Sequence, residues 1–451
     1  MSPPATFLLE PARHTPVIHS CDLCVLGGSC TGVFAAIRAA RMGLRVVLVE
    51  RAGCFGGVAT ISLVNVWHSP LDTRYEKPIL AGLTTETIER LRKRKVVNDA
   101  ACSPHWAWAF NPFELQIELD EMVREAGVMP MLHTVFVAPY VREGKLAGAI
   151  VENKSGRGII EAAFFIDATG DGDLCHRLDL PTYTAEHIQP STTCACISDY
   201  FVEGVDLPKL ILAHGAEFGL PQGFAWGARV PGSTNVYMLA GTRVYSANAS
   251  DAAQLTHSEI EGRRQVRAIM DLLRKYVPNW KGSLAALPAR IGIRETRHVK
   301  CQYQLTGSDV LSGRRFDDAI ANGSYRVDVH HADKPGITLR YLDGTEEYCR
   351  PGLPTERSRW RDPQANDPTF YQIPFRAMLP PGPFGNLLIA GRMIDADPEA
   401  HAAIRVMVNM NQTGEAAGVA AALCLEQGVA AAQLDIQRLR QTLAAGGSVV
   451  I

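Results

Sequence analysis

The stretch CDLCVLGGSCTGVFAAIRAARMGLRVVLVE, residues 21–50, decides the fold. Its apolar run to Leu26 predicts a buried parallel strand, residues 31–42 predict a helix, and LRVVLVE predicts a second buried strand. Gly27 permits a tight turn and Gly32 permits close packing of helix on strand. Glu50 ends the second strand, where a carboxylate accepts hydrogen bonds from a ribose diol. The pattern predicts a site for a dinucleotide.

A second glycine pair beyond the first turn favours a flavin dinucleotide over a nicotinamide one. Ser29 stands where the G-x-G-x-x-G pattern has its middle glycine, and its hydroxyl can donate to a phosphate oxygen. RAGCFGGVAT then supplies a second glycine pair, Gly56 and Gly57, which lets the backbone lie against a flat or charged ligand. A nicotinamide dehydrogenase has no need of this element, whereas a flavin needs chain along its whole length.

Two later segments return to the same domain. In residues 132–173 we expect three strands with turns at Glu143–Gly144 and Ser155–Gly156, ending in IDATGDGD. In residues 385–428 we expect a buried strand ending at Gly391, then a long alanine-rich helix from near Gln412 to Gly428.

The motifs GGSCTGVFAA, VERAGCFGGVAT, IDATGDGD, IGIRETRHVKCQYQLTGSDVLSGRRFDDAI and IAGRMIDADPEAHAAIRVMVNMNQTGEAAGVAAAL are spread over nearly the whole chain. With them the chain resembles the FAD-dependent oxidoreductase family of the glutathione-reductase-type flavoprotein superfamily. The resemblance is specific for FAD and not for a substrate. We expect an α/β fold in which residues 18–62, 127–180 and 371–430 form a discontinuous, doubly wound FAD-binding domain. Residues 63–126 and 181–370 would form a mixed, mostly antiparallel β substrate domain with helices, followed by a C-terminal helix and tail, 431–451.

The resemblance implies a set of cofactor-binding residues, with FAD held non-covalently. The pyrophosphate would meet the first turn, adenosine would meet the end of the second strand and the backbone near Phe136, and the flavin would meet the last helix. The implied residues are Gly27, Gly28, Ser29, Gly32, Glu50, Arg51, Gly56, Gly57, Val58, Phe136, Gly170, Asp171, Gly391, Asp395, Arg405, Asn411, Gln412 and Thr413. Arg392 stands where many related flavoproteins carry aspartate, so Asp395 is taken as the ribitol partner. Neither Cys54 nor His68 has a compelling context for covalent attachment.

Several classes of protein are disfavoured. The sequence disfavours a disulfide reductase with a redox dithiol, because Ala59 and not a cysteine lies five residues after Cys54. The net charge of −2 favours neither nucleic acid nor a membrane surface. No signal or spanning segment is evident, so we expect free thiols for the 11 cysteines and a cytoplasmic location. A homo-oligomer is left open.

Candidate catalytic residues lie in the substrate half. Asp328 and His330 alternate in YRVDVHHADKPG, so one strand face holds both, and a carboxylate there orients a histidine that titrates near neutrality and acts as base. His68 in NVWHSP is the alternative base. Arg294 in ARIGIRETRH, near Arg290 and Arg297, either binds a carboxylate or phosphate or joins an interdomain ion-pair network. We predict no metal, because a site from His330, His331 and Asp333 lacks a fourth ligand.

Other local patterns predict structure. Asn111 and Glu114 predict a capping box for a helix beginning at Pro112, and Thr256 with Glu259 predicts another. An apolar stripe through Ile260 and Ile269 is expected on that second helix. Residues 346–368 are turn-rich and predict a long surface loop. CSPHWAWAF, around His105, predicts an aromatic core patch or a ring-binding wall.

The predicted function is that of an FAD-dependent dehydrogenase or oxidase. It would take hydride from an alcohol or amine carbon of a small to medium polar substrate and pass electrons to oxygen or another external acceptor. The alternatives are a flavin monooxygenase or reductase driven by NAD(P)H, and a flavoprotein electron-transfer subunit. The cysteines do not cluster as iron–sulfur ligands do, which disfavours the last.

Overall fold

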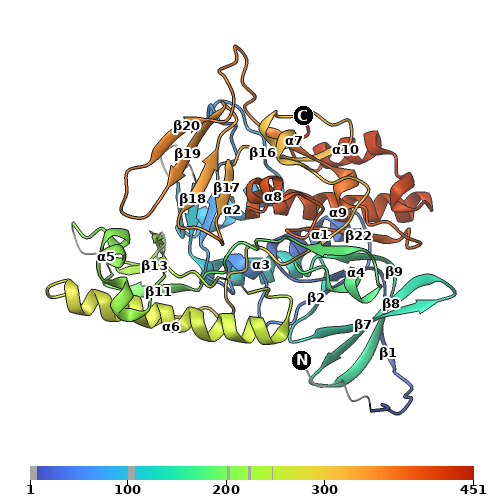
Figure 1. The fold of residues 1–451 in the computed structure, drawn as a ribbon. Coiled ribbons are helices and arrows are strands. Elements are labelled where there is room, and N and C mark those ends of the chain that lie inside the picture. Colours follow the sequence, from blue (N-terminus) through green and yellow to red (C-terminus); the bar gives the residue numbers. More distant parts are fainter. Residues whose placement is uncertain (1–7, 100–106, 201–203, 222–224, 246) are drawn as a thin grey trace.

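The computed structural model describes residues 8–99, 107–200, 204–221, 225–245 and 247–451 and shows an α/β fold (Figure 1). Its largest sheet among the described residues is mixed parallel and antiparallel, in the order β6-β2-β1-β9-β8-β7, with β22 also paired to β9. Its strands are β1 (Val17–Leu26), β2 (Val46–Val49), β6 (Met129–Met131), β7 (Val135–Arg142), β8 (Lys145–Asn153), β9 (Gly156–Asp167) and β22 (Leu387–Ile389).

The parallel part of this sheet is joined from segments far apart in the sequence. β1 pairs in parallel with β2 on one side and with β9 on the other, and β22 pairs with the last residues of β9. The valine, leucine and isoleucine side chains of β2 and β22 are buried on both faces, which a parallel sheet covered by helices requires. The chain therefore returns to this sheet twice, through β9 and β22, as the sequence predicts.

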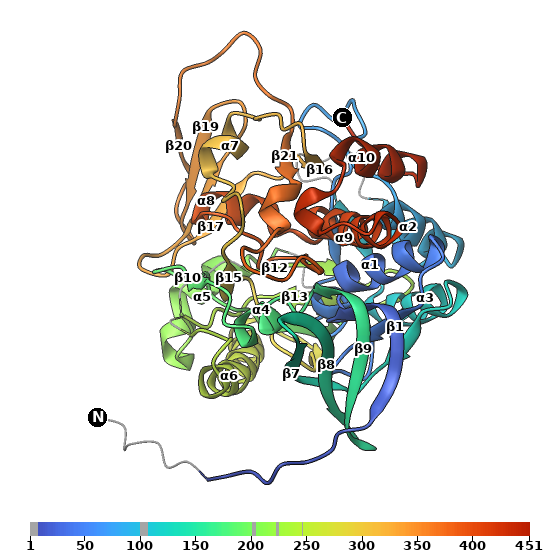
Figure 2. The same ribbon diagram turned by 90° about the vertical axis from the view of Figure 1, so that its right-hand side faces the viewer.

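The three strands expected within residues 132–173 are confirmed as β7, β8 and β9, which pair antiparallel in sequence order. Glu143 and Gly144 take φ angles of 52° and 74°, so both adopt the left-handed conformation of a tight hairpin turn. β7 and β8 form one edge of the sheet (Figure 2), and Phe136 lies on β7.

Helix α1 (Cys30–Arg41) packs directly on α9 (Met407–Gln427) beside the sheet (Figures 1 and 2). A Cβ atom on Gly414 or Gly418 of α9 would lie 2.1 or 2.2 Å from the carbonyl oxygen of Thr31 or Ala35. The glycines therefore let the two backbones touch. A buried ion pair between Arg38 and Glu415, 3.1 Å apart, also joins the helices. The expected start at Gln412 is wrong, because the helix begins five residues earlier.

The other strands of the described chain pair antiparallel, as expected for the second region. They form the sheets β12-β13-β11-β14, β17-β18-β19-β20 and β3-β5-β4 and the pairs β10–β15 and β16–β21. Their bounds are β3 Val66–His68, β4 Val97–Asp99, β5 Ala107–Phe110, β10 Thr182–Thr184, β11 Cys194–Ser198, β12 Trp226–Arg229, β13 Val236–Ala240, β14 Ser283–Ala286, β15 Arg297–Val299, β16 Ala319–Gly323, β17 Val327–His330, β18 Ile337–Arg340, β19 Thr345–Cys349, β20 Glu356–Arg359 and β21 Tyr371–Pro374.

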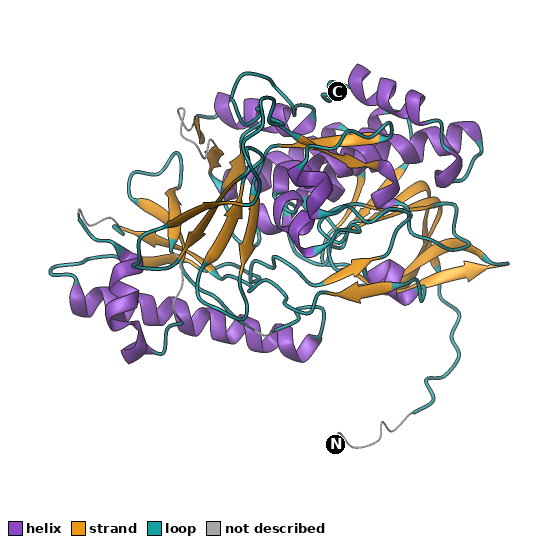
Figure 3. Cartoon of the chain, turned by 45° about the horizontal axis from the view of Figure 1, so that its top comes forward, coloured by secondary structure: helices purple, strands orange, loops and turns teal. Residues whose placement is uncertain are grey.

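The long helix α6 (Ala252–Tyr276) covers the sheet that contains β11 and β13 (Figure 3). Ile269 packs there against Ile197, but Ile260 is 61% exposed, so the expected apolar stripe is wrong at its first residue. The predicted cap is also wrong. Asp251 caps the helix, while the Thr256 hydroxyl donates to the Ala252 carbonyl inside it.

The remaining helices are α2 (Leu83–Lys93), α3 (Pro112–Glu125), α4 (Asp173–Arg177), α5 (Leu207–His214), α7 (Gly307–Leu311), α8 (Pro398–Ile404) and α10 (Ile436–Ala445). Asn111 caps α3 as expected, but Glu114 pairs with Arg94 and does not complete a capping box. Part of the expected loop 346–368 is the hairpin of β19 and β20. His105 lies outside the described residues. No helix among the described residues is both long and apolar enough to cross a membrane.

Replacing Gly418 with valine tests the contact between α1 and α9. The added side chain would be forced into the backbone of Ala35, and overpacking of this kind costs about 1–3 kcal/mol or more. We expect Gly418→Val to lower the midpoint of thermal unfolding by several degrees. Glu426→Val, at an exposed position of the same helix, is the matched control and should change it little. Equal midpoints for the two variants would contradict this account of the packing.

Candidate functional site

Two cavities meet in the middle of the molecule. The first, of about 840 Å³, lies over the turn from β1 to α1 and the end of β2. The second, of about 1,980 Å³, lies between α9 and the antiparallel sheets, and both volumes include space open to solvent. They share the lining residues Ser29, Val58, Ala168, Ile293 and Arg392. The two cavities therefore make one elongated site.

The turn between β1 and α1 has no room for side chains. A Cβ atom on Gly32 would lie 1.8 Å from the carbonyl oxygen of Gly27, and one on Gly27 would lie 2.3 Å from that of Ala168. Gly27 also has a φ of 104°, which favours glycine. Glu50 fixes the turn, because its carboxylate accepts hydrogen bonds from the amides of Gly28, at 2.7 Å, and Ala52, at 2.8 Å. It lines the first cavity as expected, with both oxygens already engaged.

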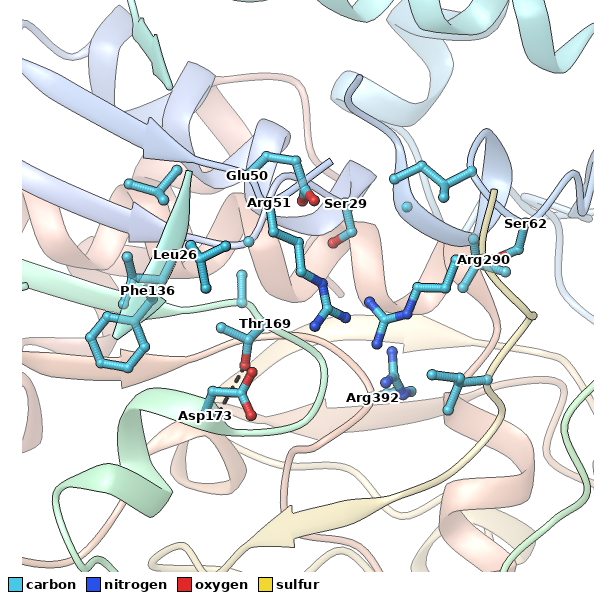
Figure 4. A pocket seen from close by; sticks show the side chains of 18 of the residues that line it. Leu26, Ser29, Glu50, Arg51, Ser62, Phe136, Thr169, Asp173, Arg290 and Arg392 are labelled. Carbon is cyan, nitrogen blue, oxygen red and sulfur yellow. Dashed lines mark hydrogen bonds between the residues drawn. The ribbon is translucent and has the colours of Figure 1, made fainter. Parts of the chain in front are cut away.

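Ser29 is the residue before α1, and its side chain does not cap the helix. It lines both cavities, and Figure 4 shows it at the first. Gly56 bridges to Ser29, and a Cβ atom on Gly57 would lie 2.8 Å from the Cβ atom of Ser29. The second glycine pair therefore folds against the first turn, and Gly57 and Val58 line the first cavity.

Three arginines point into the first cavity, namely Arg51, Arg290 and Arg392 (Figure 4). Buried Asp171 contacts two of them, at 3.4 Å to Arg290 and 2.5 Å to Arg392. Asp171 lines neither cavity, and its contacts position the two arginines. Sequence reasoning noted Arg392 only because many related flavoproteins carry aspartate at this position, and it assigned the arginine no role. Its position directly after Gly391, at the end of a buried strand, was the signal available.

The residues of the first cavity fit the adenosine diphosphate part of FAD. The amides of the first turn of α1 have no partner within the helix and carry partial positive charge. The Ser29 hydroxyl, which does not cap the helix, and the three guanidinium groups add further donors for phosphate oxygens. Phe136 lies at the other end of this cavity (Figure 4), where an aromatic ring can contact adenine.

The amino end of α9 borders the second cavity through Val406, Met407, Met410 and Asn411. Its partial positive charge favours an electron-rich group there. The other expected residues of this segment face elsewhere. Gln412 hydrogen-bonds the backbone of Asn322, and the Thr413 hydroxyl donates to the Met410 carbonyl.

Asp395 also faces away from the site, so the structure does not bring the expected ribitol partner to either cavity. Its carboxylate accepts hydrogen bonds from the Tyr183 hydroxyl, the Cys301 amide and the Gln304 side chain. Gly170 and Gly391 do line the second cavity, and so does Arg405. Cys54 lines neither cavity, whereas His68 lines the second.

Asp328 and His330 share one face of β17 and line the second cavity, with 3.3 Å between Oδ1 and Nε2. His331 faces away and contacts the Thr338 hydroxyl, so the predicted alternation is confirmed. Tyr325 donates a 2.7 Å hydrogen bond to Asp328, and its ring lies 4.3 Å from that of His68. Two histidines, a tyrosine and a carboxylate therefore converge on the cavity.

The pKa of His330 differs from the expectation of titration near neutrality. Burial lowers this pKa to about 3, and the positive charges of Arg294 and Arg243 act in the same direction against the opposing effect of Asp328. His330 is therefore neutral at pH 7. Its Nδ1 atom has no hydrogen-bond partner within the described chain.

Arg294 and Arg243 line the same cavity and form no ion pair with a carboxylate among the described residues. Arg290 and Arg297 contact Asp171 and Asp173. One of the two expectations for these arginines was an interdomain ion-pair network. Arg290 and Arg297 form such ion pairs, and Arg294 does not.

A buried group of Glu295, His298 and His401 has ligand atoms within 4.8 Å of one another, which a metal ion would require. Hydrogen bonds already engage most of it. His298 contacts Glu295 and the Ile394 carbonyl, and His401 contacts the Arg294 carbonyl. These contacts hold the backbone of Arg294 in place, so we read the group as a support for that residue.

The chain is similar to several known proteins. A curated relative, digeranylgeranylglycerophospholipid reductase 2 of Methanothermobacter thermautotrophicus, is 26% identical over 218 residues, which are 46% of this chain and 53% of that protein. The chain thus matches about half the length of this relative. A geranylgeranyl bacteriochlorophyll reductase-like protein from Thermoplasma acidophilum aligns over 95% of this chain and 84% of its own, with 11% identity and a TM-score of 0.49. An anhydrotetracycline hydroxylase from Streptomyces rimosus aligns over 95% and 66%, with 12% identity and a TM-score of 0.42.

The family match extends beyond these partial likenesses. The model of the FAD dependent oxidoreductase family matches residues 22–443, which include the glycine turn, both cavities and α9. The cofactor is therefore FAD, and the chain belongs to the FAD dependent oxidoreductase family.

Proposed function

We propose that the protein is an FAD-dependent dehydrogenase or oxidase acting on an alcohol or amine carbon. The observation that carries this proposal is the neutral His330, held by Asp328 on the wall of the second cavity with Nδ1 unpaired. A group that removes a hydroxyl or amine proton must be unprotonated and within reach of the substrate. The cavity is large enough for a medium-sized organic molecule next to a flavin.

In this proposal the chain's own residues hold the cofactor and move the proton. Ser29, the α1 amides, Arg51 and Arg290 hold the pyrophosphate and adenosine in a doubly wound domain. Bound FAD supplies the acceptor for the hydride that leaves the substrate carbon. Nε2 of His330 lies 3.3 Å from Oδ1 of Asp328, and the buried, unpaired Nδ1 is the nitrogen that would accept the substrate proton. Asp328 then stabilises the imidazolium that forms, while the Tyr325 hydroxyl fixes the carboxylate.

Two substitutions in the first turn test cofactor binding. We expect Gly32→Val to abolish FAD binding, because the added side chain would collide with the Gly27 carbonyl. Ser29→Gly restores the usual glycine and is expected to bind FAD about as well as the native chain. The measurement is the ratio of flavin to protein absorbance, with mass spectrometry of the acid-released cofactor. A tenfold loss of affinity in Ser29→Gly, about 1.4 kcal/mol, would instead make the hydroxyl a required phosphate ligand.

His330→Ala tests the proton acceptor. Loss of a positioned general base typically slows a reaction by roughly 10²–10⁴-fold. We expect His330→Ala to retain FAD and slow anaerobic flavin bleaching by that factor, in a screen over alcohols, amines and their acid derivatives. His331→Ala, on the opposite face of the strand, is the matched control and should bleach at the native rate.

Other outcomes of this screen separate the alternatives. Bleaching by NADPH, with none by alcohols or amines, would indicate a reductase or monooxygenase. A large loss of rate in His68→Ala, with none in His330→Ala, would transfer the role to His68. Because the pKa of His330 is about 3 when no acid is bound, protonation of this residue should not slow bleaching by neutral alcohols as the pH falls from 8 to 5.

A further inference from the structure

The second cavity carries an excess of positive charge that the catalytic proposal does not use. Among the described residues that line it, the ionised acid is Asp328, whereas the arginines are Arg243, Arg294, Arg326, Arg392 and Arg405. Asp171 pairs with Arg392, and Asp328 contacts Arg405. Arg243 and Arg294 therefore face the cavity without a carboxylate partner in the described chain.

Arg243 is the more deeply buried of the two, with 3% of the residue exposed. Its Nη1 atom donates to the Thr242 carbonyl at 2.7 Å, and its backbone amide is held by Gln265. Its Nη2 atom is buried and has no hydrogen-bond partner. A buried guanidinium with an unsatisfied donor and no paired carboxylate is unfavourable. The position is therefore suited to a ligand that supplies a hydrogen-bond acceptor and a negative charge.

Arg294 lies beside Arg243. Its Nη1 atom donates to the Thr192 hydroxyl at 2.5 Å, and Nη1 of Arg243 lies 3.4 Å from the same oxygen. Two guanidinium groups thus converge on one hydroxyl, where they repel each other. Burial lowers the pKa of both. An anion between them would relieve the repulsion and satisfy the free donors.

The neighbouring wall of the cavity is apolar. It includes Val64, Val66, Ala225, Trp226 and Ala240. This end of the cavity is formed by β11, β12 and β13, whereas the donors for FAD phosphate are at the turn between β1 and α1. The arginine pair and its apolar surroundings are therefore separate from the phosphate site of the cofactor.

We propose that Arg243 and Arg294 bind the acidic group, a carboxylate or a phosphate monoester, of an amphipathic organic acid whose apolar body lies against this wall. The substrate class becomes an organic acid with an alcohol or amine carbon near His330. This inference rests on the proposed function in taking the second cavity as the substrate site.

Binding of matched probes to the FAD-loaded protein tests the inference without requiring turnover. The probes are hexanoate, hexyl phosphate, hexanamide, 1-hexanol and inorganic phosphate. Binding of each probe is measured by the flavin difference spectrum and by calorimetry. We expect at least one of the two acids to bind ten times or more as tightly as hexanamide and 1-hexanol. Tighter binding of hexanoate identifies a carboxylate as the natural group, and tighter binding of hexyl phosphate with measurable binding of inorganic phosphate identifies a phosphate.

Variants locate the site. Arg294→Gln and Arg243→Gln should each weaken acid binding tenfold or more, while FAD content stays native and the affinity for 1-hexanol is unchanged. Arg229→Gln, at an exposed arginine on β12, is the control and should bind the acids as the native protein does. If Arg243→Gln gives no FAD-loaded protein, Arg294→Gln carries the test alone.

The inference is overturned if the acids bind no more tightly than hexanamide, or if Arg294→Gln binds them with native affinity. Failure of the proposed function has a different signature. In that case acids would bind and depend on Arg294, while no hydroxy or amino acid bleached the flavin and His330→Ala had no effect.

Discussion

The direct contact of α1 with the backbone around it is the constraint on which the rest of the structure depends. Gly32 places the helix against the turn of Gly27, and Gly414 and Gly418 place α9 against the carbonyls of Thr31 and Ala35. Because no side chain intervenes, the amino end of α1 is held at the mouth of the first cavity. The amino end of α9 is held at the second by the same packing. One rigid arrangement thus sets both ends of the elongated site.

Charge along this site is arranged in two cationic groups with different supports. Near the first turn, buried Asp171 pairs with Arg290 and Arg392, so the arginines there are partly neutralised before any ligand binds. At the far end, Arg243 and Arg294 rest on hydroxyl and carbonyl oxygens alone. Hydrogen bonds to neutral oxygens orient a guanidinium but do not cancel its charge. The second group is therefore the one whose energetics are most sensitive to an incoming anion.

Sequence reasoning was most successful where local chemistry decides the structure. The turn with Gly27 and Gly32, the hairpin at Glu143–Gly144, and the alternation of Asp328 and His330 all follow from short-range backbone geometry. Domain boundaries and the roles of the catalytic candidates stay predictions.

Sequence reasoning was less successful where distant segments meet. Asp395 was expected at the ribitol but is taken by Tyr183 and Cys301, which lie far away in the sequence. The start of α9 was misplaced because its N-cap residue is Val406, whose side chain makes no capping hydrogen bond that would mark a helix end. The pKa of His330 could not be anticipated, because it reflects burial and arginines that come from loops far away in the sequence.

The two proposals are linked through His330. Burial is the main cause of the low pKa of His330, and Arg294 and Arg243 lower this pKa further because a protonated imidazole would add a positive charge beside theirs. An acid bound between these arginines would cancel part of that charge and so raise the pKa of His330 toward neutrality. A general base is most effective when its pKa lies near the working pH. On this argument an organic acid improves the base that acts on it, whereas a neutral alcohol of the same shape leaves His330 a poor proton acceptor. Discrimination between the two would then be expressed in the rate of proton removal as well as in affinity.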